Sequence, residues 1–123
     1  EWHRGLAIMT ADLATRWAAL NGLSVAPEPF GLAALADNPP TGAEQVQTPN
    51  AESATFLVDE EGQPAAIIFI SFGGHWMTTM GELCRWMRLP AFRPPRPRED
   101  GEQHFIVVSR PGARDPKWLP EHQ

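Results

Sequence analysis

The sequence predicts a small α+β protein in which an N-terminal helix and a central helix pack on a small, mainly antiparallel sheet. A β-hairpin pattern covers residues 54–72, and an apolar strand pattern follows at His104–Val108. Stretches with helical spacing of apolar residues flank the hairpin on both sides. The length of 123 residues suits one modest core, so we expect a single domain over residues 1–123.

The N-terminal helix is predicted from about Gly5 to Leu20. Asn21-Gly22 follows it and supplies the left-handed residue that commonly ends a helix. Apolar residues recur at three- and four-residue steps, which places them on one helix face: Leu6, Met9, Leu13, Trp17 and Leu20.

A second, short helix is predicted over Phe30–Ala36, entered through two prolines and stopped by "DNPP". The polar stretch Asp37–Ser53 follows, with three prolines and almost no apolar residue. We expect it to be an exposed, mobile loop.

The stretch "ATFLVDEEGQPAAIIFISF" predicts the hairpin, with strands over Thr55–Val58 and Ala65–Phe72. Gly62 in the turn can adopt positive φ. The second strand is apolar without alternation, which predicts a central strand covered on both faces. The third strand is His104–Val108.

The central helix is predicted over Trp76–Arg88, and Pro90 stops it. An irregular tail begins at about residue 111, and Trp118-Leu119 is expected to anchor it to the body. The predicted core residues lie on the apolar faces of the strongest patterns: Trp17, Ile68, Phe69, Leu83 and Ile106.

The net charge of −5 argues against a protein whose whole surface attracts nucleic acid, although a local basic site remains open. No apolar run approaches the roughly 20 residues that cross a bilayer, so we expect no membrane partner. The single cysteine excludes an internal disulfide framework and fits a reducing compartment, so the expected location is the cytoplasm.

The stretch "FISFGGHWMTT" suggests an anion site, because a strand leading through glycines to a helix start presents backbone N–H groups. The candidate residues are Gly73, Gly74, His75, Thr78 and Thr79. The stretch lacks the lysine of a phosphate loop and the GxSxG pattern. The competing interpretation is a tight turn in which the glycines avoid a clash.

Cys84 and His104, together with His75, form a candidate catalytic set. A cysteine nucleophile requires a thiolate, usually assisted by a histidine. The cysteine on a helix and the histidine on a strand resemble the layout of papain-like amidases. The resemblance covers only these isolated residues. The competing interpretation is that Cys84 fills the core, as buried cysteines commonly do.

Metal and cofactor motifs are absent, and we expect no bound metal or cofactor. The four histidines lack the spacing of metal ligands: they are His3, His75, His104 and His122. The acidic run Asp59-Glu60-Glu61 lies in the hairpin turn, where solvated carboxylates are ordinary, and it lacks the spacing of a calcium loop.

A run of arginines from residue 85 to residue 98 contains no acidic residue. The candidate binding residues are Arg85, Arg88, Phe92, Arg93, Arg96 and Arg98, with Trp86 interleaved. The Arg/Pro-rich loop 88–98 also contains the PxxP core Pro94–Pro97, which favours an extended polyproline conformation. The competing interpretation is a solvated, stiff connection.

The sequence thus favours a non-enzymatic protein-binding module of adaptor or inhibitor type. It would contact a protein partner through loop 88–98 and nearby aromatic residues, and the arginines favour an acidic partner. The alternative is a small cysteine-dependent hydrolase or transferase that uses Cys84 and His104.

Overall fold

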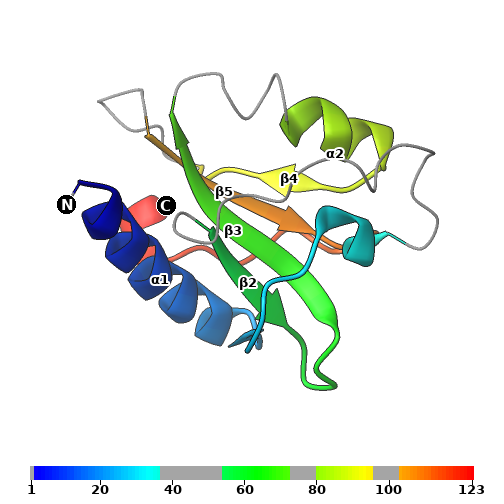
Figure 1. The fold of residues 1–123 in the computed structure, drawn as a ribbon, viewed down its shortest axis with the longest axis horizontal. Helices are drawn as coiled ribbons and strands as arrows, with labels where there is room; N and C mark the ends of the chain where they lie inside the picture. The colour runs from blue at the N-terminus through cyan, green and yellow to red at the C-terminus, as the bar shows by residue number, and fades with distance from the viewer. Residues whose placement is uncertain (1, 37–53, 73–79, 96–102) are drawn as a thin grey trace.

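The computed structural model describes residues 2–36, 54–72, 80–95 and 103–123. Within them, a five-stranded antiparallel sheet has the strand order β1-β2-β3-β5-β4 (Figure 1). The strands are β1 (Ser24–Val25), β2 (Ala54–Val58), β3 (Pro64–Phe72), β4 (Ala91–Phe92) and β5 (Gln103–Ser109). The helices are α1 (Trp2–Leu20) and α2 (Glu82–Trp86), with 3-10 turns η1 (Leu32–Leu35) and η4 (Pro120–His122). The predicted α+β class is confirmed.

The β2–β3 hairpin and β5 form the centre of the sheet. Strand β3 pairs with β2 on one side, where Phe56 lies opposite Ile67. On its other side β3 pairs with β5, where Phe69 lies opposite Ile106. Strand β3 is therefore interior to the sheet, as its unbroken apolar sequence predicts.

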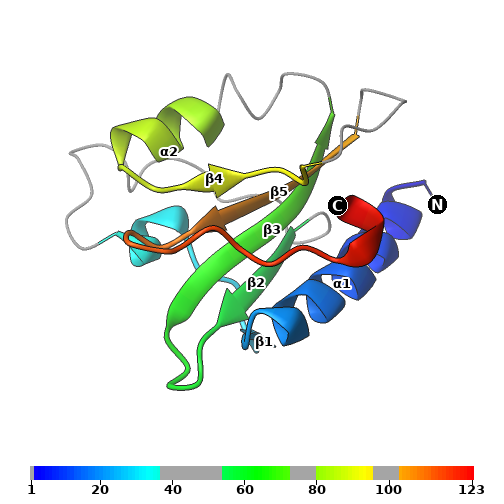
Figure 2. The same ribbon diagram turned by 180° about the vertical axis from the view of Figure 1, so that it is seen from behind.

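Both faces of the sheet are covered by helices (Figures 1 and 2). Successive residues of a strand point to opposite faces, so β3 and β5 each supply two hydrophobic clusters. The α1-side core is buried against α1 and the C-terminal segment: Ala14, Trp17, Ala18, Leu57, Ala66, Ile68, Phe105, Val107 and Leu119. The α2-side core is buried against η1 and α2: Leu32, Leu35, Ala54, Phe56, Ile67, Phe69, Met80, Leu83, Cys84, Met87, Leu89, Ile106 and Val108. All five predicted core residues are buried.

The face of helix α1 that packs on the sheet differs from the apolar face predicted from the sequence. Ala14, Trp17 and Ala18 are buried, whereas Leu20 is 39% exposed. Small alanines let the helix backbone approach the sheet closely, with one large indole filling the remaining space. The buried face is thus rotated toward the alanines, and the assignment of Leu20 to this face is wrong.

The C-terminal segment is fastened to α1 by polar and aromatic contacts. The Asn21 side chain donates from Nδ2 to the Lys117 carbonyl and accepts the Lys117 N–H at Oδ1, both at 3.0 Å. Arg16 Nη2 and Glu121 Oε1 form an ion pair at 2.5 Å. The Trp17 and Trp118 ring centroids lie 6.1 Å apart, and Leu119 is buried in the α1-side core.

Four sequence predictions need correction or fall outside the described residues. The expected helix over Phe30–Ala36 is only the 3-10 turn η1. The expected loop 88–98 contains β4, which pairs Ala91 with Val108 and Phe92 with Val107 of β5. The predicted mobile loop 37–53 and the first four residues of the predicted helix 76–88 (residues 76–79) lie outside the described residues.

The Asp59 carboxylate holds the β2–β3 turn and joins it to the end of β5. Its Oδ1 accepts the backbone N–H groups of Glu61 at 3.0 Å and Gln63 at 2.9 Å. Its Oδ2 pairs with Arg110 Nη1 at 2.7 Å, and the side chain is only 13% exposed. The Asp59 carboxylate is thus hydrogen-bonded and ion-paired, whereas Glu60 and Glu61 in the same turn are exposed, as expected of solvated carboxylates. The hydrogen bond from Arg110, and then the backbone hydrogen bonds, hold the pKa of the Asp59 carboxyl below its ordinary value of 3.8.

Truncation of Phe69 to Ala should lower the free energy of unfolding by about 3–5 kcal/mol, because it opens a cavity in the α2-side core. The exposed Val25, truncated to Ala, is the control and should change stability by less than about 0.5 kcal/mol. Urea unfolding measures both. A loss for the Phe69 variant no larger than for the control would contradict the burial of β3.

Acidification should remove the stabilisation that Asp59 contributes. Because its folded pKa lies below the unfolded value, the contribution is complete above pH 3.8 and is lost as pH falls through the folded pKa. Asp59→Asn keeps an acceptor oxygen but removes the charge, so its stability at neutral pH should fall. The difference from the wild type should then shrink in acid.

Urea unfolding from neutral to acidic pH measures this difference. Glu60→Gln is the control, since Glu60 is exposed in the same turn. A constant difference between Asp59→Asn and the wild type across the whole pH range would contradict the assignment.

Candidate functional site

Helix α2 separates apolar and polar side chains between its two faces. Leu83, Cys84 and Met87 are buried in the α2-side core. Arg85, Trp86 and Arg88 are exposed, and Trp86 is 53% exposed although it is one of the largest apolar side chains. We call these three exposed residues the Arg–Trp surface. Neither arginine makes a side-chain hydrogen bond or ion pair within the described parts of the chain.

The end of α2 fixes Arg88 in an unusual backbone conformation. Leu89 N–H donates to the Cys84 carbonyl at 2.7 Å, and Arg88 N–H donates to the Arg85 carbonyl at 3.1 Å. These two bonds form a Schellman motif, whose residue after the C-cap is left-handed. Arg88 occupies that position with φ 60°.

The end of α1 has the same motif with the usual residue. Leu23 N–H donates to the Ala18 carbonyl at 2.8 Å, and Gly22 has φ 71°. A left-handed non-glycine residue costs roughly 1–2 kcal/mol. The structure therefore contains one helix end with glycine and one with a strained arginine, and packing of Leu89 in the α2-side core holds the strained end.

The remaining residues of the arginine run have mixed surroundings. Phe92 lies on β4, half-buried against the α1-side core, so its ring is not freely presented. Arg93 is exposed just after β4. Arg96 and Arg98 lie outside the described residues.

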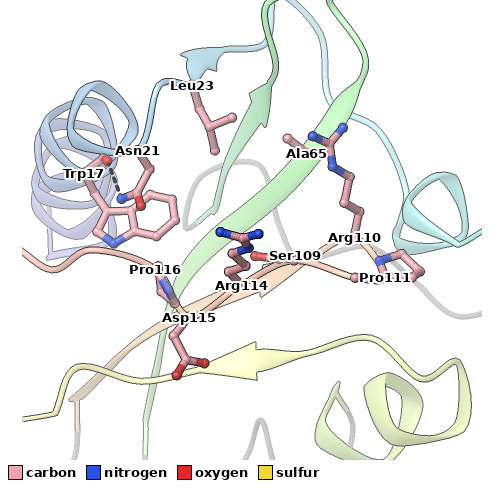
Figure 3. A pocket seen from close by; sticks show the side chains of 12 residues that line it. Trp17, Asn21, Leu23, Ala65, Ser109, Arg110, Pro111, Arg114, Asp115 and Pro116 are labelled. Carbon is pink, nitrogen blue, oxygen red and sulfur yellow. Dashed lines mark hydrogen bonds between the residues drawn. The ribbon is translucent and has the colours of Figure 1, made fainter.

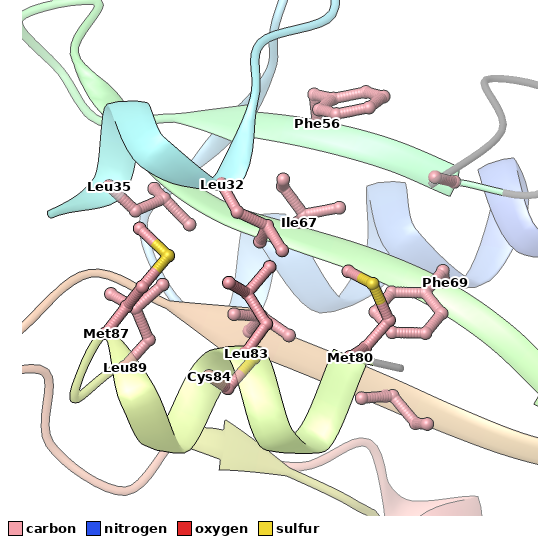
Figure 4. Close-up of a cluster of buried hydrophobic side chains, with 13 residues drawn as sticks. Leu32, Leu35, Phe56, Ile67, Phe69, Met80, Leu83, Cys84, Met87 and Leu89 are labelled. Carbon is pink, nitrogen blue, oxygen red and sulfur yellow. The ribbon is translucent and has the colours of Figure 1, made fainter. Parts of the chain in front are cut away.

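Cys84 is buried among apolar side chains on the inner face of α2 (Figure 4). Burial raises the pKa of its thiol to about 11, because the thiolate loses its hydration. A nucleophilic cysteine needs the opposite shift. These surroundings are those of a core side chain.

His104 shares a sheet face with Ile106 and Val108, the face that α2 covers, and it is half-buried. In the described part of the chain, it makes no hydrogen bond with Cys84. His75 and the candidate anion site, Gly73, Gly74, Thr78 and Thr79, fall outside the described residues.

Two further observations concern the described residues alone. No three side chains of the metal-binding types gather there closely enough to hold an ion. None of the helices in that part combines the length and hydropathy needed to cross a bilayer.

Sequence analysis missed a cavity of about 300 Å³ between the end of α1, the start of β3 and the turn after β5. Ser109, Arg110 and Arg114 line it. The available signal was the dipeptide Pro111-Gly112 between two arginines, since such a turn folds both side chains back toward one region. The predicted binding residues also omit Trp86, although it lies among the arginines of residues 85–98 in the sequence.

No protein-family model matches this chain, and no curated protein and no solved structure is significantly similar to it.

A thiol reagent should leave Cys84 unlabelled in the native protein and label it at once after denaturation. The buried, protonated thiol reacts only through opening of the α2-side core. Labelling is followed by mass spectrometry near neutral pH, with denatured protein as the control. Rapid native labelling would instead indicate an accessible thiolate and revive the catalytic alternative.

Proposed function

We propose that this protein is a non-enzymatic binding module of adaptor or inhibitor type. It contacts an acidic protein partner through the Arg–Trp surface and the adjoining segment 88–98, including Arg93, Arg96 and Arg98. The free cysteine is compatible with a reducing location such as the cytoplasm. The exposure of Trp86 between two arginines on a helix that is otherwise packed inward carries this proposal.

Tryptophan and arginine are the residues most enriched among interface hot spots. Their large side chains lose much hydrated surface on docking, and the guanidinium pairs with carboxylates in two-pronged fashion. A half-exposed indole is unfavourable in water by roughly 25 cal/mol for each Å² of apolar surface. A partner that covers Trp86 would regain this free energy.

Charge favours an acidic partner. The chain carries a net charge of −5, yet no acidic residue occurs from Arg85 to Arg98. Neither Arg85 nor Arg88 is neutralised by a described carboxylate. A surface of one sign within a protein of the opposite sign orients an oppositely charged partner before contact.

The backbone strain at Arg88 also supports a binding role. Glycine would form the same helix end without strain, as Gly22 does at the end of α1. Strained non-glycine residues persist where the surrounding structure holds them in place, and they cluster at binding and catalytic sites. Here the left-handed residue sets the direction in which the Arg88 side chain leaves the helix.

The cysteine-dependent alternative has no comparable support. The thiol of Cys84 is buried with a raised pKa, and it forms no hydrogen bond with His104 in the described part of the chain. We therefore propose binding alone.

Arg88→Gly should stabilise the protein while weakening partner binding. Relief of roughly 1–2 kcal/mol of strain exceeds the roughly 0.5–1 kcal/mol by which glycine favours the unfolded chain. The free energy of unfolding should rise by about 0.5–1 kcal/mol. Affinity for the partner should fall by about tenfold or more, which corresponds to about 1.4 kcal/mol. Trp86→Ala should weaken binding similarly with little change in stability.

The partner is first captured from native host extract on immobilised wild-type protein and is then purified for titration against each variant. Arg114→Gln serves as the control, because Arg114 is an exposed arginine on the α1 side of the sheet. Equal affinity of wild type, Arg88→Gly and Trp86→Ala for every purified partner would sink the proposal. So would a loss of the same size in the control.

A further inference from the structure

The cavity lies at the end of the sheet, on the α1 side (Figure 3). Trp17, Asn21 and Leu23 from the end of α1 form one wall. The opposite wall is the chain that leaves β5. A β-turn shapes that wall, since Ala113 N–H donates to the Arg110 carbonyl at 3.3 Å. Gly112 takes φ 80° in the turn, where a side chain would be strained.

Ser109 is a buried residue that lines the cavity and whose hydroxyl has no described partner. Its residue is only 7% exposed, and its place on β5 directs it to the same side as Phe105 and Val107 of the α1-side core. Within the described residues, nothing hydrogen-bonds the Ser109 hydroxyl, and the residue lines the cavity. A hydroxyl that lines a cavity and is not used within the protein can donate to or accept from a bound ligand.

Hydrogen-bond donors predominate among the unused polar groups of the wall. The Arg114 guanidinium has no hydrogen bond or ion pair within the described part of the chain. Arg110 uses one N–H on Asp59 and keeps others. The indole N–H of Trp17 is buried without an acceptor. Asp115 is the acid in the lining, and Figure 3 shows its carboxylate turned away from the Arg114 guanidinium toward β4.

The rest of the wall is apolar and small. Leu23, Ala65, Pro111 and Pro116 flank the donors. A volume of about 300 Å³ lies at the lower end of the range for small-molecule sites. The Arg110 guanidinium is already neutralised by Asp59, so the unpaired Arg114 guanidinium leaves room for a single negative charge.

We propose that this cavity binds a small monocarboxylate with a short apolar body. The carboxylate accepts from the Arg114 guanidinium and the Ser109 hydroxyl. The apolar body lies against Leu23 and the two prolines. This site is separate from the Arg–Trp surface and does not depend on the function proposed for it.

Benzoate is the probe, and benzamide, which has the same shape without the charge, is its matched control. Backbone amide and indole signals of isotope-labelled protein are followed by nuclear magnetic resonance during titration. Benzoate should give saturable shifts at residues 109–115, and benzamide should bind at least about tenfold more weakly. Arg114→Gln and Ser109→Ala should each weaken benzoate binding, the first by about tenfold or more.

Arg16→Gln should bind benzoate like the wild type, because Arg16 is an exposed arginine of α1 that pairs with Glu121 and does not line the cavity. The proposal is overturned if benzoate gives no saturable shift, or if benzamide binds equally well. It is also overturned if inorganic phosphate binds as tightly as benzoate, since the apolar walls would then contribute nothing. Unchanged benzoate binding by folded Arg114→Gln overturns it too, as does an equal loss in Arg16→Gln.

Discussion

Burial of β3 on both faces is the constraint on which the rest of this structure depends. Ile67 and Ile68 are successive residues that point to opposite faces, and both are completely buried. A sheet with two apolar faces needs a cover on each side. Helix α1 and the C-terminal segment supply one cover, and η1 and α2 supply the other. A chain of this length has few elements to spare, so almost every described element is used as cover.

This use of elements determines which surfaces remain for function. Helix α2 is short, and its inward face is filled by Leu83, Cys84 and Met87. The Arg–Trp surface is what the helix presents outward once that face is packed. On the other side, a segment without regular structure completes the cover from Arg110 to Lys117. Extended chain fits a sheet less closely than a helix does, and the cavity lies beneath this segment.

The sequence predicted elements whose patterns are local and failed where distant packing decides. The hairpin and β5 are strongly apolar and were predicted within about a residue at most ends. Strand β4 has only two residues, and its pairing with Val107 and Val108 depends on a contact across the sheet. Exposure of Leu20 was likewise invisible, because periodicity assigns a residue to a face but does not say where the cover ends.

The two candidate sites differ in the same way, because one is formed by neighbours in the sequence and the other by distant residues. The arginine run is visible in sequence because its residues are neighbours, whereas the cavity joins α1 to the turn after β5 across about ninety residues.

The ends of α1 and α2 show that the residue type alone does not determine the backbone conformation at a helix end. Both ends make the same pair of hydrogen bonds, yet one uses Gly22 and the other Arg88. Leu23 and Leu89 each pack on the core just after the left-handed residue, so hydrophobic packing can force that conformation on either side chain. The strained backbone fixes the direction of the Arg88 Cα–Cβ bond, whereas the guanidinium, which no described side chain holds, becomes ordered only when a partner binds.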